Sequence, residues 1–173
     1  MPPEPPPFDA VEILGALERH GVRFVLIGGF AAVLHGATIA TRDIDITPAA
    51  DEENLQRLAN ALAELGAGIR VDGEPPVQLP HDARLLASAT IWNLTTRYGD
   101  LDISVIPSGT AGYDDLHRGA SSRPVGRGVR IDVASIDDII RSKEAAARPK
   151  DQATLPELRD VRARARQDLD LDR

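Results

Sequence analysis

Two short stretches of alternating acidic and aliphatic residues limit most strongly how this chain of 173 residues can fold. The first reads DIDI at residues 43–46, and the second reads DLDISV at residues 100–105. Successive side chains of a β-strand point to opposite faces, so each stretch predicts a strand with one carboxylate face and one aliphatic face. The aliphatic face can enter a core, whereas the carboxylate face needs solvent, a cation or a polar partner.

The rest of the chain predicts helices around a mixed sheet, which is an α+β fold rather than a doubly wound parallel one. A tight turn at residues 98–100 joins two of the predicted strands into a hairpin. Strands are expected at residues 22–27, 43–47, 69–71, 91–97, 101–106 and 129–133. Helices are expected at residues 9–20, 30–35, 51–65, 81–87, 112–119, 135–147 and 156–167.

The prolines set the expected boundaries near both ends of the chain. Pro149 is expected to break the helix before it, and Pro156 is expected to begin the last helix. Residues 72–80 and 123–128 are expected to be loops. We therefore predict a disordered, proline-rich lead over residues 1–8 and a single domain over residues 9–173, whose C-terminal helical part spans about residues 135–168.

Composition excludes several classes of protein. The chain has no cysteine, so disulfides and thiolate metal sites are excluded, and its four histidines show no zinc-binding spacing. No apolar run reaches the roughly 20 residues that span a membrane, and the N-terminus does not resemble a signal peptide, so a cytoplasmic protein with no membrane partner is expected. The net charge is -7, which argues against a general nucleic-acid coat, although the last third of the chain is basic.

The acidic strand faces suggest a metal site. Asp43 and Asp45 share one strand face, and Asp102 lies on the equivalent face of the second strand. Mg²⁺ prefers carboxylates, waters and substrate phosphates, and three such side chains can form a two-metal cage in which one ion activates a hydroxyl and the other steadies a leaving pyrophosphate. The alternative is a pair of solvated polar strand faces.

Two further features suit a phosphate. Gly28 and Gly29 stand between a strand end and a helix start, where exposed backbone N–H groups favour anions, although a plain tight turn is the simpler interpretation. Lys143 falls in the middle of the apolar side of its predicted helix, so it either snorkels to the surface or reaches into a pocket to meet an anion. Arg42 and Lys150 are weaker candidates.

These elements together resemble the DNA polymerase beta-like nucleotidyltransferases. The run LIGGFAAVLHGATIATRDIDI is similar to their signature, and the segments TRYGDLDISVIPSG and SIDDIIRSKEAAARPKD match the branch that includes the AbiEii-type and MenT-type bacterial toxins. The resemblance covers about residues 9–160. It implies a nucleotidyltransferase fold in which Gly28 and Gly29 contact the triphosphate of a nucleoside triphosphate (NTP). It also implies that Asp43 and Asp45 bind two Mg²⁺ ions, that Asp102 is the third ligand and candidate base, and that Lys143 meets the triphosphate.

The same branch implies an acceptor and a partner. Its members transfer nucleotides to the 3′ end of tRNA, act as toxins that inhibit translation, and are neutralised by antitoxin proteins. In some cases the antitoxin phosphorylates a residue at the position of Thr41, and Thr38 is nearby. The arginine-rich segments at residues 117–130 and 148–166 suit an RNA backbone or are simply solvated faces. The RNA-binding candidates are Arg118, Arg123, Arg127, Arg130, Arg162 and Arg166.

Other acceptors stay open, because the chain lacks the larger C-terminal helical region of fuller toxin members. A small-molecule nucleotidyltransferase, such as an aminoglycoside-modifying enzyme, uses the same cage and needs an acidic pocket, which Asp72, Glu74 and Asp82 would supply. A protein acceptor is a third possibility. The non-catalytic alternative is a nucleotide-binding or antitoxin module with a relict site.

Overall fold

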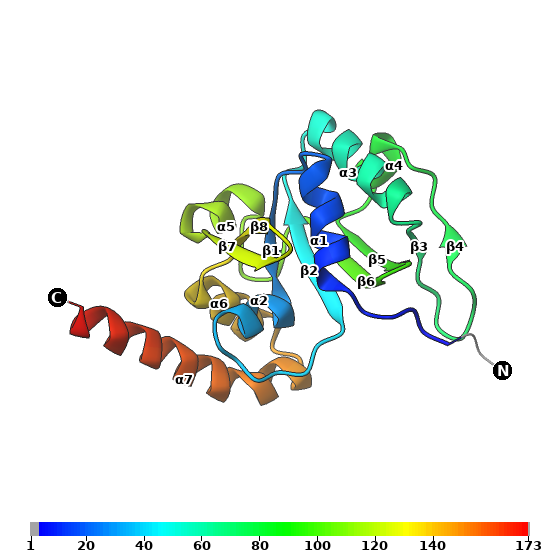
Figure 1. The fold of residues 1–173 in the computed structure, drawn as a ribbon. Coiled ribbons are helices and arrows are strands. Elements are labelled where there is room, and N and C mark those ends of the chain that lie inside the picture. The colour runs from blue at the N-terminus through cyan, green and yellow to red at the C-terminus, as the bar shows by residue number, and fades with distance from the viewer. Residues whose placement is uncertain (1–3, 173) are drawn as a thin grey trace.

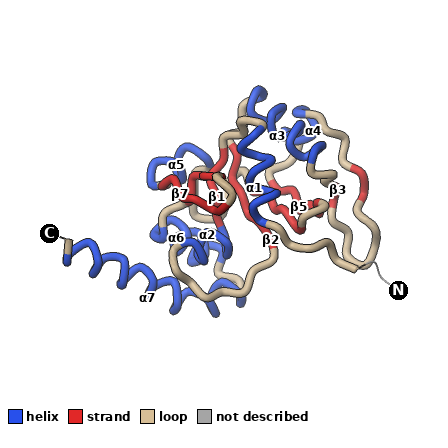
Figure 2. The backbone as a smooth tube through the Cα atoms, in the orientation of Figure 1, coloured by secondary structure: helices blue, strands red, loops and turns tan. Residues whose placement is uncertain are grey.

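The computed structural model describes residues 4–172, which form one mixed sheet with helices around it (Figures 1 and 2). The strands are β1 (Phe24–Ile27), β2 (Asp43–Pro48), β3 (Gly68–Ile69), β4 (Val77–Gln78), β5 (Ile91–Thr96), β6 (Gly99–Ser104), β7 (Ser121–Gly126) and β8 (Val129–Val133). The helices are α1 (Ala10–Arg19), α2 (Gly28–Leu34), α3 (Glu52–Glu64), α4 (Ala83–Ala87), α5 (Tyr113–Gly119), α6 (Ile136–Ala146) and α7 (Pro149–Leu171).

The sheet has the strand order β4-β3-β5-β6-β2-β1-β8-β7. Strand β2 runs parallel to β6 and antiparallel to β1, and β1 runs parallel to β8. Strands β5 and β6 form the expected antiparallel hairpin. The mixed sheet flanked by helices confirms the predicted α+β fold.

The aliphatic faces of the central strands lie in the core. Ile44 and Ile46 of β2 are completely buried, and so is Leu101 of β6. Helices α1, α3 and α4 lie together on one side of the sheet, whereas α2 and α6 begin where β1 and β8 end (Figure 1). This arrangement leaves the carboxylate faces of β2 and β6 turned away from the core.

Helices α1, α3 and α6 each begin at a side chain that accepts a hydrogen bond from the first turn. Asp9 accepts from the backbone N–H of Glu12 at 3.1 Å, which starts α1. Asp51 and Ser135 do the same for α3 and α6. Side-chain caps of this kind satisfy backbone donors that have no partner inside the helix, so these helix starts follow from local sequence.

The C-terminal helix is longer than predicted. Pro149 occupies its first turn, where a missing N–H costs nothing, and Pro156 lies inside the helix instead of beginning it. Residues 156–167 are helical as predicted, but the predicted start of the helix at Pro156 was wrong. Leu155, Leu158 and Val161 are buried, and this packing outweighs the one intrahelical hydrogen bond that Pro156 cannot make. Beyond these residues α7 projects away from the sheet (Figure 1).

The predicted loop at residues 123–128 was also wrong for most of its length. Residues 121–126 form the edge strand β7, which pairs antiparallel with β8. An edge strand tolerates Pro124, because one row of its backbone donors needs no partner strand. The register shifts between Pro124 and Gly126, and the turn itself lies at Arg127 and Gly128.

The N-terminal lead is described only in part, since residues 1–3 lie outside the described range. Residues 4–9 form neither helix nor strand. Phe8, which was predicted to belong to a disordered lead, packs edge-to-face against Phe30 with ring centroids 6.2 Å apart. None of the helices formed by residues 4–172 combines the length and the apolar character that crossing a membrane would take.

Candidate active site

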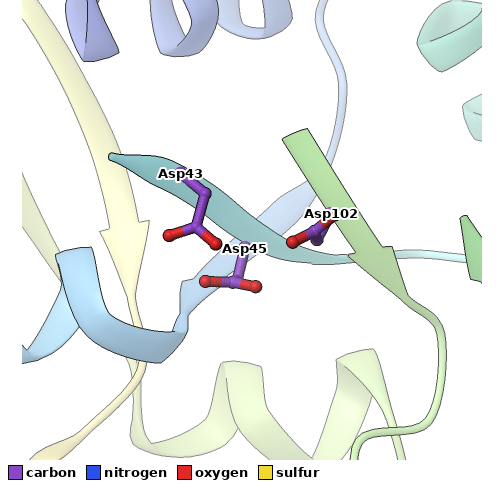
Figure 3. Close-up of side chains that lie close together, drawn as sticks. All are labelled: Asp43, Asp45 and Asp102. Atoms are coloured by element: carbon purple, nitrogen blue, oxygen red, sulfur yellow. The ribbon is translucent and has the colours of Figure 1, made fainter. Parts of the chain in front are cut away.

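The parallel pairing of β2 and β6 brings three carboxylates together. The register places Asp45 beside Asp102 and Asp43 beside Asp100. One carboxylate oxygen from each of Asp43, Asp45 and Asp102 lies within 4.8 Å of the other two. Figure 3 shows the two side chains of β2 and the side chain of β6 converging on one region. The three acidic residues singled out in the sequence therefore form one cluster.

The glycine turn closes one edge of this cluster. Helix α2 begins at Gly28, directly after β1, and Gly28 has a φ angle of +74°. A Cβ atom at Gly28 would lie 2.4 Å from Oδ2 of Asp45, which is closer than non-bonded atoms can approach. Both the backbone conformation and the close approach therefore require glycine here.

Crowding of the carboxylates perturbs their protonation. Burial, together with the charges of Asp43 and Asp102, raises the pKa of Asp45 to about 7. Lys150 and Lys143 act in the opposite direction, which shows that both ammonium groups lie near enough to influence this carboxylate. The cluster is thus short of positive charge, as a site that receives cations should be.

Arg70, which follows β3, is a site residue that sequence reasoning missed. Its Nη2 atom lies 2.6 Å from Oδ1 of Asp102, and its Nη1 atom lies 2.7 Å from Oδ2 of Asp100. Burial raises the pKa of Asp102, and the adjacent guanidinium of Arg70 opposes that increase. No sequence signal marked Arg70, because its contact with Asp102 depends on the pairing of β3 with β5.

A second group of cations stands at the turn between α6 and α7. The same cavity as the three carboxylates is lined by Lys143 of α6, by Arg148, which directly precedes α7, and by Lys150 of α7. Lys143 was predicted to reach into a pocket and Lys150 was a weaker candidate, whereas Arg148 was missed.

A buried aspartate holds two of these cations. Asp151 is completely buried and accepts hydrogen bonds from Nε of Arg148 at 2.7 Å and from Nζ of Lys143 at 3.4 Å. Although burial alone would raise the pKa of Asp151, these partners lower it, so the carboxylate stays charged. Asp151 also caps the start of α7 by accepting from the backbone N–H of Arg148. An acid two positions after Pro149 was the available sequence signal.

The cavity that contains these groups has a volume of about 740 Å³. The glycine turn, Thr41 and the cations of α6 and α7 line one part of it. Arg70, Ile91, Asn93 and Ser104, which come from the β3, β5 and β6 region, line another part. A volume of this size accommodates an NTP or a drug-sized molecule.

The remaining predicted residues occupy different places. Arg42 is exposed and is not among the residues that line the cavity. The hydroxyl of Thr41 donates to Oδ1 of Asp43 at 2.9 Å, so Thr41 lies at the cluster. Thr38 instead donates from its backbone N–H and its hydroxyl to Oε1 of Glu157.

The six arginines predicted to bind RNA hydrogen-bond within the chain, and none of them lines the cavity. Their partners are Asp115 for Arg118, the Leu34 carbonyl for Arg123, Asp9 and Glu12 for Arg127, Ser122 for Arg130, and Asp137 for both Arg162 and Arg166. Most of their charge is therefore already partnered by acidic groups of the chain.

The acidic cluster has the chemistry of a site for hard divalent cations. It offers only carboxylate oxygens from Asp43, Asp45 and Asp102, and these are the protein ligands that Mg²⁺ prefers. Burial raises the pKa of Asp45, the charges of Asp43 and Asp102 raise it further, and bound cations would relieve this repulsion. The residues present therefore fit a divalent metal site.

Comparison with known proteins places this geometry in context. Residues 9–88 match the family model of the aminoglycoside-2″-adenylyltransferases. The lincosamide antibiotic adenylyltransferase LnuA, solved with lincomycin bound, has a similar structure, with a TM-score of 0.58 and 20% sequence identity over 90% of this chain and 99% of LnuA. A presumed nucleotidyltransferase from Thermotoga maritima matches less well, with a TM-score of 0.48 and 18% identity over 94% of this chain and 90% of that protein. A comparison of the sequence with curated proteins gives no match.

The likeness to LnuA extends the nucleotidyltransferase fold over nearly the whole chain. The family match includes the glycine turn and the Asp43–Asp45 pair, and it ends before Asp102. The comparisons do not show the AbiEii or MenT toxin branch, so that finer assignment stays a prediction.

Proposed function

We propose that this chain, a nucleotidyltransferase by its fold, its family match and its acidic triad, transfers a nucleotidyl group from an NTP to a hydroxyl group of a small molecule. The observation that carries the proposal is the convergence of Asp43, Asp45 and Asp102 in one cavity with the cations of α6 and α7. The similarity to adenylyltransferases of antibiotics supports a small-molecule acceptor over a tRNA acceptor.

The proposed reaction uses the residues of this chain in distinct roles. The acceptor oxygen forms a bond to the α-phosphorus of the NTP, the bond from that phosphorus to the bridging oxygen breaks, and pyrophosphate leaves. Asp102 accepts the proton of the hydroxyl group. Lys143 and Lys150 meet the phosphates, whose negative charge needs counter-charge at the leaving group.

Divalent cations held by Asp43, Asp45 and Asp102 would supply charge neutralisation and would make the acceptor hydroxyl more acidic. The backbone of the Gly28–Gly29 turn allows the phosphates to approach closely, because no side chain stands in the way. Asp151 positions Lys143 and Arg148, since it binds both of them and has no contact with solvent.

Transfer to a tRNA 3′ end, as in a toxin–antitoxin system, is the second candidate. It has less support, because the arginines predicted to bind RNA are engaged within the chain and lie outside the cavity. Regulation by an antitoxin that phosphorylates Thr41 stays a prediction of the toxin resemblance. A phosphate on Thr41 would stand beside Asp43 and repel an NTP.

The test is an assay with each of four α-labelled NTPs, Mg²⁺ and three acceptors: lincomycin, an aminoglycoside and bulk tRNA. We expect label in a small molecule and none in tRNA. Asp43→Ala should abolish labelling, and Asp72→Ala, which removes an exposed aspartate outside the cavity, should not. Labelling of tRNA alone would favour the toxin hypothesis, and labelling that survives Asp43→Ala would refute the proposed site.

A further inference from the structure

The order of the strands gives the active site two unlike sides. The acidic triad lies on β2 and β6 at the centre of the sheet, and the α6–α7 turn with Lys143 and Lys150 follows β8 on one side of it. On the other side, beyond Asp102, stand β5 and the end of β3. We name four residues that line the cavity here the β5-side wall: Arg70, Ile91 and Asn93 of this second side, and Ser104 of β6, which lies opposite Ile91 in the register.

The acceptor has to approach along the β5-side wall. In nucleotidyl transfer the attacking and leaving oxygens lie roughly in line on opposite sides of the phosphorus. The leaving pyrophosphate belongs with Lys143 and Lys150, because these cations offset its charge. The attacking hydroxyl therefore comes from the opposite direction, where Asp102 is adjacent to Arg70 and Asn93.

This wall has no free carboxylate among the residues that the structure describes. Asp102 and Asp100 both pair with Arg70, and Asp102 belongs to the metal cluster. Asp138, the remaining acid that lines the cavity, pairs with Arg141 at 2.9 Å.

The acids predicted to form an acidic acceptor pocket are elsewhere. Asp72, Glu74 and Asp82 are exposed, and none of them lines the cavity. Asp82 instead caps α4 by accepting from the backbone N–H of Arg84 at 2.8 Å. The wall thus offers a polycationic acceptor no unpaired carboxylate, because Arg70 already occupies Asp100 and Asp102.

The wall also carries apolar surface. Ile91 is 62% exposed, although it is a large aliphatic residue and lines the cavity. Its neighbour on the same strand face, Asn93, lies opposite Asp102 in the register and supplies an amide that can donate and accept hydrogen bonds. Apolar surface with a few polar groups is typical of a site for a small organic molecule.

We infer that the acceptor is a hydroxyl compound that is neutral or carries a single charge and has an apolar part, and that Arg70, by pairing with Asp100 and Asp102, leaves acceptors with several ammonium groups without a carboxylate partner. This inference rests on the proposed function and narrows it to one class of acceptor. A charge that is bound without a partner lowers affinity strongly, so the preference against a polycation should be roughly a hundredfold in kcat/KM.

The first experiment compares two acceptors with the wild-type protein, Mg²⁺ and the preferred NTP. We expect kcat/KM for lincomycin to exceed kcat/KM for an aminoglycoside with several amino groups by roughly a hundredfold. Equal or better use of the aminoglycoside would overturn the inference and leave the proposed function intact. Failure to label any acceptor would contradict the proposed function instead.

The second experiment measures the ratio of the two kcat/KM values in Arg70→Gln. If the substitution perturbs Asp102, both reactions slow alike and the ratio does not change. Removal of the Arg70 charge should instead shift the ratio toward the aminoglycoside by at least about tenfold. Arg84→Gln, a matched change at an exposed arginine outside the cavity, should leave the ratio unchanged. An unchanged ratio in Arg70→Gln would refute the role of Arg70.

Calorimetry tests the same inference without turnover. Both compounds are titrated into the wild-type protein in the presence of Mg²⁺ and a non-hydrolysable NTP analogue, so that the acidic triad is occupied. We expect the aminoglycoside to bind more weakly than lincomycin, and tighter binding of the aminoglycoside would overturn the inference.

Discussion

Replacement of Asp45 by asparagine should stabilise the metal-free protein while it abolishes activity. Asp45 lies partly buried beside Asp43 and Asp102, and these surroundings raise its pKa from 3.8 to about 7. Between these two values the folded protein binds more protons at Asp45 than the unfolded chain does, so the stability of the fold decreases as pH increases. The substitution Asp45→Asn removes this dependence.

The size of the effect follows from the two pKa values. At about 1.4 kcal/mol per pH unit, the difference between 3.8 and about 7 corresponds to about 4 kcal/mol, which is an upper bound because some water reaches the site. The destabilisation of the wild type relative to Asp45→Asn should be near zero at about pH 4, should grow up to about pH 7 and should stay constant above that.

Urea denaturation of both proteins at pH 4, 6 and 8, with metal removed by a chelator, measures this difference directly. Titrating groups remote from the acidic cluster affect both proteins alike and cancel, so the difference reports the carboxylates of the cluster. Saturating Mg²⁺ at pH 8 should stabilise the wild type and have little effect on Asp45→Asn. Asp72→Asn, at an exposed position, serves as the control. A stability difference that does not change between pH 4 and pH 8 would refute the argument that the carboxylates crowd one another.

Three further substitutions test other parts of the structure. Gly28→Ala would place a Cβ 2.4 Å from Oδ2 of Asp45 in a left-handed backbone conformation. We therefore expect denaturation to show a loss of about 1–2 kcal/mol in unfolding free energy, and kcat of the Mg²⁺-dependent reaction to fall at least about tenfold. A kcat equal to that of the wild type would contradict this. Asp151→Asn breaks a buried charge cluster, so it should lower the unfolding free energy by about 3–5 kcal/mol. It should also raise KM for the NTP by much more than it changes KM for the acceptor. An unchanged KM for the NTP would count against the positioning role of Asp151. Asn54→Ala leaves the backbone N–H of Arg23 without its acceptor, so it should lower the unfolding free energy by about 1–3 kcal/mol. We expect kcat/KM at 20 °C to stay unchanged. A changed kcat/KM would show that the start of α3 influences the site.

Local pattern was enough to predict the parts of the site that lie within single strands. Alternation with a period of two put Asp43 and Asp45 on one face of β2 and Asp102 on the equivalent face of β6, because side-chain direction in a strand depends only on position along the chain. Capping residues such as Ser135 predicted helix starts for the same reason, since the interaction spans only three residues.

Contacts between distant segments were not predictable in this way. Arg70 binds Asp102 only because β3 pairs with β5 at one particular register, and no local signal encodes that register. Asp151 is an ordinary acid in the first turn of α7, and its burial against Lys143 depends on how α6 and α7 pack. Pro156 misled the prediction because tertiary burial of the helix face overrode a local helix-breaking tendency.

The parallel pairing of β2 with β6 also has a consequence for how the protein matures. Asp45 of β2 and Asp102 of β6 pair across the sheet although 57 positions separate them in the chain. The intervening segment, which includes α3 and strands β3 to β5, has to be synthesised and folded before the two residues meet. Contacts between such distant residues are formed late, because closing the long intervening loop costs entropy. We therefore expect the catalytic centre to form only when the sheet closes, so that the onset of enzyme activity during refolding reports this closure rather than the formation of secondary structure.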